Sequence, residues 1–451
     1  MPTDAKQFSN IASFVLDRDL AIAESALAMA TKLLADTIGV AAGAARLEVA
    51  GIARDFAADF HATDNPKTSG RMMFDGRRVS IPGAAWAAAT QIDSLDAHDG
   101  FNPVKGHIGC AVVPALFAFA ENLPGLTGRE ALTTLAMSYE VAGRAGLALH
   151  STVSDYHTSG AWNALAVAAL GCRLLEADTD TLRQALGIAE YHGPRSQMMR
   201  EIDNPTMLHD GSGIGALTGT NAALLAMRGF TGAPALTIED DGVADIWTDL
   251  GDRWTIEENY IKPYPICRWA HAAIDAARYL KLEHGFEADD VEKIEIRTFA
   301  EASRLFAAMP KTTSQAQYSM AFAVATMLRH GEIAPEHIAD GGLSDPAIEK
   351  IVSKVEVTEA DRHNARFPSG RWSDATVTLK DGRIFDSGDV SARGGFDTPL
   401  ELSEVREKFD MMTQAALLSS RSDEIWNTCF ELLNEDATFS KLARLVCAPV
   451  N

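Results

Sequence analysis

The chain has 451 residues, of which 47% are hydrophobic and 23% are charged, and its formal net charge is −22 at pH 7. This composition is typical of a soluble globular protein. The length favours two domains, because one compact core rarely extends over so many residues. The negative charge argues against nucleic acid as a partner, since phosphate binding needs a basic face. An anionic substrate would therefore need a local pocket of Lys, Arg or His side chains.

Targeting and membrane signals are weak in this sequence. The first twenty residues lack a basic start followed by a long apolar run, and apolar stretches such as ALAVAAL at 164–170 are too short to span a membrane. The cysteines are odd in number, widely spaced and without a C-x-x-C pair: Cys110, Cys172, Cys267, Cys429 and Cys447. We expect a cytoplasmic protein with reduced thiols, no membrane association and no zinc site.

Helical periodicity dominates residues 5–265. Apolar residues recur at three- and four-residue spacing in Ala- and Leu-rich segments such as AIAESALAMATKLLADTIGVAAGAA. Thr127 and Asp178 stand where helix N-caps are expected, directly before such segments. This part of the chain is predicted to be all helical.

Strand patterns appear between residues 266 and 400. VEKIEIRTF and KVEVTEA alternate between apolar and polar residues, and ATVTLKDGRIFDSGDV is predicted to be a hairpin with a type I′ turn at Asp381-Gly382. Helical patterns return from residue 401. We therefore expect a mainly α protein: an all-helical domain over 1–265, completed by helices in 401–451, and a smaller α+β lid domain over 266–400.

The loop over residues 96–107 combines two carboxylates, two imidazoles and an ammonium group within twelve residues. It holds Asp96, His98, Asp99, Lys105 and His107, and glycines and a proline interrupt any regular helix there. Such loops beside a helix start are frequent locations of functional sites. The alternative is a solvated acidic loop without chemistry.

Further His and Lys residues stand beside Gly, Pro, Ser or Thr at predicted helix boundaries. They include His157, His209 and the segment IKPYPICRWAH, which contains Lys262, Arg268 and His271. A single histidine of this kind is more often structural, but several such clusters favour an enzyme that moves protons with imidazoles and holds a small anion with cationic groups. No P-loop, dinucleotide-binding or zinc-protease motif is present, so we predict no nucleotide, flavin or metal.

The order and the amino-acid sequences of several segments resemble those of the MmgE/PrpD family. The segments are LLADTIGVAAGAA, DAHDG…KGHIG, DYHTSGAWNALAVAALGCRLL, ALGIAEYHG, MLHDGSGIGALTGTNAALLAMRGFTGAP, IKPYPICRWAHAAIDAA and QAQYSMAFAVATMLRHGEI. The resemblance implies a helical domain with an α+β lid, a homodimer, and cofactor-free chemistry in the cleft between the domains.

The resemblance also implies site residues. The family's loop aspartate matches Asp96, its two histidines match His107 and His157, and its interdomain lysine matches Lys262. Three positions depart from the family pattern. His209 stands where a lysine is expected, and Cys267 stands where a decarboxylase of the family has a histidine. Phe322 replaces a tyrosine, which leaves Tyr318 as the nearest phenol.

These residues are assigned roles as hypotheses. His107 and His157 are the general base and the general acid. Asp96 orients an imidazole, and its alternative role is a helix cap or loop brace. Lys262, together with His209 or Arg268, neutralises the reacting carboxylate. Substrate contacts are expected from Lys105, Asp99, His271 and Tyr318, although Lys105 could instead pair with Asp99.

The predicted activity is that of a cofactor-independent lyase, of the dehydratase type, acting on a small hydroxy-di- or tricarboxylate through proton abstraction beside a carboxylate. The alternatives are an isomerase or epimerase of a dicarboxylate, a carboxy-lyase, and a non-catalytic carboxylate-binding protein.

Overall fold

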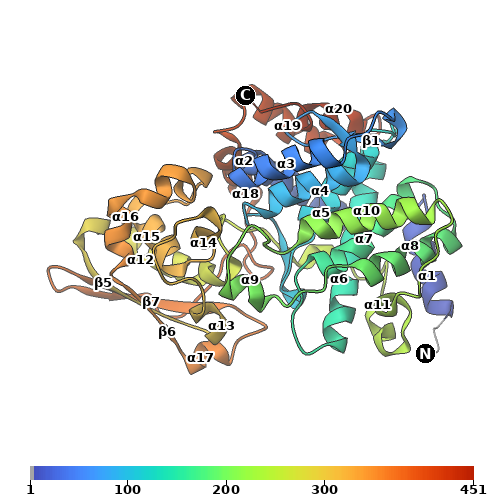
Figure 1. The fold of residues 1–451 in the computed structure, drawn as a ribbon. Helices are drawn as coiled ribbons and strands as arrows, with labels where there is room; N and C mark the ends of the chain where they lie inside the picture. The colour runs from blue at the N-terminus through green and yellow to red at the C-terminus, as the bar shows by residue number, and fades with distance from the viewer. Residues whose placement is uncertain (1–4, 451) are drawn as a thin grey trace.

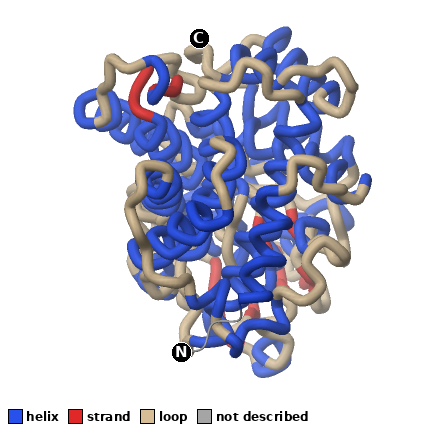
Figure 2. The backbone as a smooth tube through the Cα atoms, turned by 90° about the vertical axis from the view of Figure 1, so that its right-hand side faces the viewer, coloured by secondary structure: helices blue, strands red, loops and turns tan. Residues whose placement is uncertain are grey.

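The computed structural model describes residues 5–450, and it consists of a large helical body and a smaller region built around one sheet (Figure 1). The tube view in Figure 2 shows that helices make up most of the chain and that strands are few. The prediction of a mainly α fold with a smaller α+β part is confirmed.

The helical body is built by the first half of the chain and closed by the C-terminus. Its helices are α1 (Ala5–Leu16), α2 (Glu24–Ala44), α3 (Glu48–Phe60), α4 (Ile81–Asp93), α5 (Gly109–Ala120), α6 (Gly128–Thr152), α7 (Gly160–Leu174), α8 (Thr179–His192), α9 (Met199–Asp203), α10 (Ser212–Ala226) and α11 (Leu236–Glu239). Two short antiparallel pairs also belong to it, β1 (Ser69–Arg71) with β2 (Arg78–Ser80), and β3 (Gly100–Phe101) with β4 (Asn259–Tyr260).

The smaller region contains a five-stranded sheet in the order β6-β5-β7-β8, with β9 also paired to β7. Its strands are β5 (Val291–Thr298), β6 (Val355–Glu359), β7 (Trp372–Leu379), β8 (Ile384–Asp386) and β9 (Val390–Ser391). Its helices are α12 (His271–His284), α13 (Ala300–Ser303), α14 (Thr313–Gln317), α15 (Met320–His330), α16 (Pro346–Val352) and α17 (Asp361–Asn364). Ile294, Ile296 and Val377 are fully buried, whereas Lys293 and Glu295, which alternate with the two isoleucines, form an ion pair. Helices α12 and α15 contact this sheet, as the alternation predicts.

Three helices end the chain: α18 (Leu402–Thr413), α19 (Ser419–Glu431) and α20 (Phe439–Val446). They return to the helical body, where α18 and α19 contact α2 and α20 contacts α5. The buried Lys408 ammonium of α18 lies 2.6 Å from the Asp36 carboxylate of α2 and donates to the Ala97 carbonyl at 2.7 Å. The C-terminal helix thereby supports the loop that follows α4.

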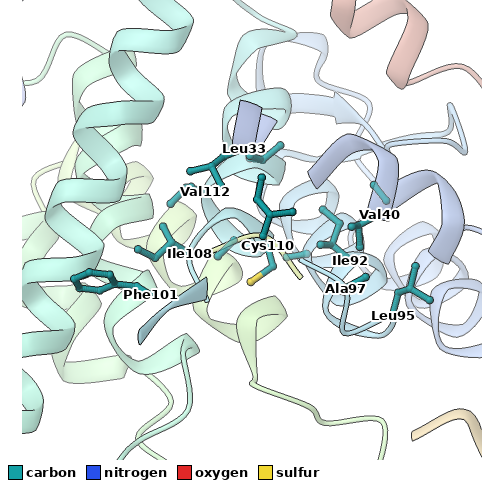
Figure 3. Close-up of a cluster of buried hydrophobic side chains, with 14 of the residues drawn as sticks. Leu33, Val40, Ile92, Leu95, Ala97, Phe101, Ile108, Cys110 and Val112 are labelled. Atoms are coloured by element: carbon teal, nitrogen blue, oxygen red, sulfur yellow. The ribbon is translucent and has the colours of Figure 1, made fainter. Parts of the chain in front are cut away.

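An apolar cluster lies beneath the loop between α4 and α5 (Figure 3). Ile92, Leu95 and Ala97 enter it from the α4 side, and Ile108 and Cys110 enter it from the start of α5. These side chains are at most 1% exposed, so the two ends of the polar loop are held by a closely packed core.

Helix α2 also belongs to this core. Among residues 5–450 it is the one helix long and apolar enough to cross a membrane by length and composition, and 78% of its apolar window is buried inside the protein. Burial of that extent is typical of a core helix.

Local predictions had mixed outcomes. Both helix caps are confirmed, because Thr127 Oγ1 accepts from the Glu130 amide at 3.1 Å and Asp178 Oδ1 accepts from the Thr181 amide at 2.8 Å. The predicted type I′ turn is wrong. Leu379 and Arg383 are hydrogen-bonded across a loop of three residues, in which Gly382 alone has a positive φ, of 88°. A turn of that length needs the left-handed conformation only at its last residue.

Candidate active site

The candidate site is a narrow cavity between the helical body and the sheet region. It is lined by Asp96, Lys105, His107, Glu201, Asp210, Tyr260, Lys262, Cys267, Arg268, Tyr318 and Arg371, together with apolar side chains of α9 and the 266–269 segment. Helix α9 lies between the two parts of the molecule (Figure 1), and Asp203 at its end pairs with Arg304 beyond α13 at 2.5 Å. Both parts of the chain therefore contribute walls to the cavity.

Among residues 5–450, three of the six non-glycine residues with a positive φ lie at or next to the cavity lining. Asp96, Lys105 and His209 have φ values of 52°, 56° and 44°, in the left-handed region that residues with a Cβ rarely adopt. Strain of this kind persists only where the surroundings impose it, and it is frequent at functional sites.

Lys262 and Asp96 form a buried ion pair. The ammonium donates to the Asp96 side chain and, at 3.0 Å, to the Asp96 backbone carbonyl. Burial would lower the pKa of Lys262, but the Asp96 carboxylate reverses this effect and raises the pKa above its usual value. Lys262 therefore presents a fixed positive charge to the cavity. Asp96 pairs with this ammonium, so the expectation that it orients an imidazole is wrong.

His107 is held from both ring nitrogens. Its Nδ1 lies 2.5 Å from the backbone carbonyl of Asp99, and because a carbonyl only accepts, Nδ1 carries a proton. Its Nε2 lies 3.1 Å from Asp210 Oδ2. At that distance a favourable contact requires one proton between the nitrogen and the carboxyl oxygen. When this proton is lost, Nε2 is a base beside a carboxylate that would stabilise its protonated form.

Four carboxyl groups near this imidazole, those of Asp93, Asp96, Glu201 and Asp210, affect one another. Burial, followed by the charge of Asp96, raises the pKa of Asp210 to about 6. Burial, followed by the charges of Asp210 and Asp93, raises the pKa of Glu201 well above its usual range. Glu201 Oε2 is buried without a hydrogen-bond partner. The cavity thus holds a carboxyl group whose protonated form is favoured relative to that of an exposed glutamate.

His98 lies directly behind His107. The two rings meet edge to face with centroids 4.4 Å apart, and neither ring nitrogen of His98 has a hydrogen-bond partner. Burial, followed by the charges of His107 and Lys262, lowers the pKa of His98 well below its usual range. Ligand atoms of Asp96, His98 and His107 lie within 4.8 Å of one another, as in a metal site. This donor set fits a cation poorly, because the Lys262 ammonium already pairs with Asp96.

His209 and Tyr318 stand close together. Their ring centroids are 5.9 Å apart, and His209 Nε2 lies 3.4 Å from Ser314 Oγ. Burial, followed by the charge of Lys262, lowers the pKa of His209 to about 4, so this imidazole is neutral. His209 is therefore a neutral polar group that does not replace the positive charge of a lysine.

Three more cations line the cavity, and each donates to neutral oxygens. Lys105 Nζ donates to the Asn102 carbonyl at 2.7 Å, Arg371 donates to the Asn102 side chain, and Arg268 donates to the carbonyls of residues 392 and 393 at 3.0 and 2.6 Å. Lys105 does not pair with Asp99.

Four predicted site residues do not line the cavity: Asp99, His157, His209 and His271. His209 lines a separate pocket. Asp99 Oδ2 accepts from the Gly109 amide at 3.3 Å at the start of α5. The Nε2 of His271 donates to the Ile266 carbonyl at 2.9 Å and its Nδ1 lies 3.3 Å from Arg268, so this ring braces the 266–271 turn. His157 is partly exposed, and its backbone amide donates to His150 Nε2 at 3.0 Å. The side chains of Asp99, His157 and His271 therefore do not line this cavity.

The sequence interpretation missed Asp210, Glu201 and Arg371. Asp210 carried a usable signal, because it directly follows His209 in a Gly-framed motif. Glu201 lies on a five-residue helix with no periodicity, and Arg371 reaches the cavity from the distant sheet region. Only the tertiary structure places those two beside His107 and Lys262.

Comparison with known proteins gives consistent matches along the chain. The MmgE/PrpD N-terminal domain model matches residues 9–253, and the MmgE/PrpD C-terminal domain model matches residues 264–432. The chain is 24% identical over 400 residues to human cis-aconitate decarboxylase, covering 84% of this chain and 81% of that protein. It is 23% identical over 418 residues to a cis-aconitate decarboxylase-like protein of Aspergillus oryzae, covering 82% and 83% of the two chains.

A shorter match is to the mitochondrial 2-methylcitrate dehydratase of Yarrowia lipolytica, 28% identical over 195 residues, or 38% of this chain and 36% of that protein. Because the two domain models together account for nearly the whole sequence, and the fold has the helical body and α+β region described above, the chain belongs to the MmgE/PrpD family.

Proposed function

We propose that this protein is a lyase that removes a proton beside a carboxylate of a small di- or tricarboxylate and eliminates a hydroxyl group as water. The observation that carries the proposal is the His107–Asp210 pair, 3.1 Å apart, in a cavity that also holds the Lys262 ammonium. The names of the relatives, a decarboxylase and a dehydratase of polycarboxylates, support the lyase class.

His107 is the proposed general base. The Asp99 carbonyl fixes its Nδ1–H, which leaves Nε2 as the reactive nitrogen, and Asp210 would stabilise the imidazolium that forms. A general base of this kind contributes about 10²–10⁴-fold to the rate.

Lys262 is the proposed stabiliser of the developing charge. Proton loss beside a carboxylate places additional negative charge on its oxygens, so a preorganised cation there lowers the barrier by a few kcal/mol, roughly the effect of one oxyanion donor. The ion pair with Asp96 keeps the ammonium in place before substrate arrives.

Glu201 is the proposed general acid. Departure of hydroxide at neutral pH needs a proton donor, and the raised pKa of Glu201 together with its unpartnered Oε2 supplies one in the same cavity. This assignment takes the place of the one expected for His157.

A second candidate is an isomerase, and one observation favours it. His209 and Tyr318 lie close together and form a second possible proton-transfer pair besides His107 and Asp210. One pair could remove a proton from one face of a carbon, and the other pair could return a proton to the opposite face. A carboxy-lyase is the third candidate, on the names of the long-matching relatives.

The test is ¹H NMR in D₂O of the purified protein with citrate, 2-methylcitrate, malate, tartrate, cis-aconitate and iminodisuccinate. Loss of water to give an alkene supports the proposal. Deuterium entry with inversion and no elimination would assign the isomerase, and release of carbon dioxide would assign the carboxy-lyase. No enzyme-dependent change with any of the six in folded protein would contradict the proposed reaction on this substrate class.

A further inference from the structure

The cavity contains more positive charge than its own carboxylates neutralise. Lys262 is paired with Asp96, but within residues 5–450 no carboxylate lies within 4.0 Å of the charged nitrogens of Lys105, Arg268 or Arg371. All three side chains are at most 7% exposed. Isolated buried cations are costly, and proteins normally pair them or bind an anion beside them.

Two of these cations also keep unused hydrogen-bond donors. The Nε atoms of Arg268 and Arg371 are buried and have no partner. The guanidinium groups lie 4.6 Å and 5.7 Å from the centroid of the Tyr260 ring, so one aromatic ring positions both. A planar oxyanion beside this ring would accept hydrogen bonds from the Nε donors that otherwise have no acceptor.

Two of the three cations, Lys105 and Arg371, are held by one residue of the 96–107 loop, Asn102. Asn102 accepts from Lys105 through its backbone carbonyl and from Arg371 through its side chain, and its Nδ2 donates to the Ser369 carbonyl at 2.8 Å. Lys105 and Asn102 belong to the helical body, whereas Arg371 and Ser369 belong to the sheet region. The arrangement therefore exists only when the two parts are in contact.

We propose that Lys105, Arg268 and Arg371 form a subsite for a second carboxylate of the substrate, separate from the carboxylate that Lys262 stabilises. This inference rests on the proposed function and deepens it by naming what the substrate must carry. The ring of Tyr260 lies near both groups, with its centroid 6.4 Å from that of His107 and 4.6 and 5.7 Å from the guanidinium groups of Arg268 and Arg371. The second carboxylate would bind beside this ring while the reacting carbon lies at His107. A monocarboxylate would leave all three cations unpaired.

A second, outer pocket adjoins the subsite. Arg268, Arg371 and Tyr260 line the narrow cavity on one side and a surface pocket with Asn102 and Ser369 on the other. The surface pocket also contains Glu258 and Asp397, so the excess of positive charge lies in the inner cavity.

The test measures binding without turnover. Propane-1,2,3-tricarboxylate has no hydroxyl group to eliminate, so its affinity can be measured by calorimetry whether or not the protein is a lyase. Butanoate is the matched monocarboxylate. Wild type is compared with Arg371→Gln, Lys105→Met and the control Arg383→Gln, whose exposed side chain lies in the β7–β8 turn. Arg371→Lys keeps the charge, and thermal unfolding checks that each variant is folded.

The expected result is that the tricarboxylate binds wild type and Arg383→Gln at least tenfold tighter than butanoate does. Arg371→Gln and Lys105→Met lose at least tenfold of that affinity, and Arg371→Lys loses less. Equal affinity for the two ligands, or unchanged tricarboxylate affinity in both folded variants, would overturn the subsite. If no substrate turns over but this pattern of affinities is found, the subsite stands and the proposed reaction fails.

Discussion

The Nε2 atom of His107 lies 3.1 Å from the Oδ2 atom of Asp210, which comes from the turn before α10. This contact joins the 96–107 loop to the start of α10, two segments that are separate in the sequence. Because the Asp99 carbonyl fixes the other ring nitrogen, the protonation state of the pair decides whether Nε2 is a free base.

Replacing Asp210 with Asn should reduce kcat by about 10²-fold or more, the range of general acid–base contributions. The amide would donate permanently to Nε2 and block the base. The pKa of Asp210 is raised to about 6, so the wild-type rate should rise as pH increases through about 6, when the shared proton is lost. The variant should lack this limb of the pH–rate profile. An unchanged profile would show that another pair controls the base.

Replacing Lys262 with Met should lower the free energy of unfolding by about 3–5 kcal/mol, since it leaves the buried Asp96 carboxylate without its partner. The Asp96→Asn/Lys262→Met double variant should recover part of that loss, because both charges are gone. Equilibrium denaturation in urea measures both values. A single-variant cost below about 1 kcal/mol would contradict the buried-pair description, since that is the value of an exposed pair.

Replacing Glu201 with Gln should lower kcat by about 10²-fold while KM changes little, because the amide keeps the shape but cannot give up the proton that a leaving hydroxide needs. Asp203→Asn, at the exposed end of the same helix, is the matched comparison for folding and stability. Steady-state kinetics with the substrate found by NMR gives both constants. A Gln variant with full kcat would remove Glu201 from the mechanism.

Carboxylate binding should take up a proton near neutral pH. Burial, followed by the charge of Arg371, lowers the pKa of Lys105 to about 7, so part of the free protein carries an uncharged amine there. A bound carboxylate favours the charged amine, and affinity should fall as pH rises through about 7. Calorimetry at pH 7.5 in two buffers with different ionisation enthalpies detects the uptake. Lys105→Met should abolish the buffer dependence, and persistence of that dependence would assign the proton to another group.

Much of the fold could be predicted from sequence because its determinants are local. The three- and four-residue periodicity defines the helices, Thr127 and Asp178 mark two helix starts, and alternation defines β5 and β7. The Asp381-Gly382 turn was predicted wrongly, because the dipeptide indicates a turn but not the number of residues between the paired strands.

The site was predictable only in part. His107, Lys262, Lys105 and Arg268 were identified from motif context, and the structure brings all four into one cavity. Asp99 and His271 stand in the same motifs, but the Asp99 side chain accepts from the first turn of α5 and the His271 side chain braces a backbone turn. The motif alone does not distinguish such structural roles from a place in the cavity. Arg371 reaches the cavity through the packing of the sheet region on the helical body, which no local pattern encodes.

The most direct test of the central claim is solvent deuterium exchange at the carbon beside the substrate carboxylate, followed by ¹H NMR. Wild type and His192→Ala, an exposed control at the end of α8, should exchange at equal rates. His107→Ala should be slower by at least about 10²-fold, the low end of a general base's contribution, while still binding propane-1,2,3-tricarboxylate. Exchange in folded His107→Ala at the wild-type rate would contradict the assignment of His107 as the base.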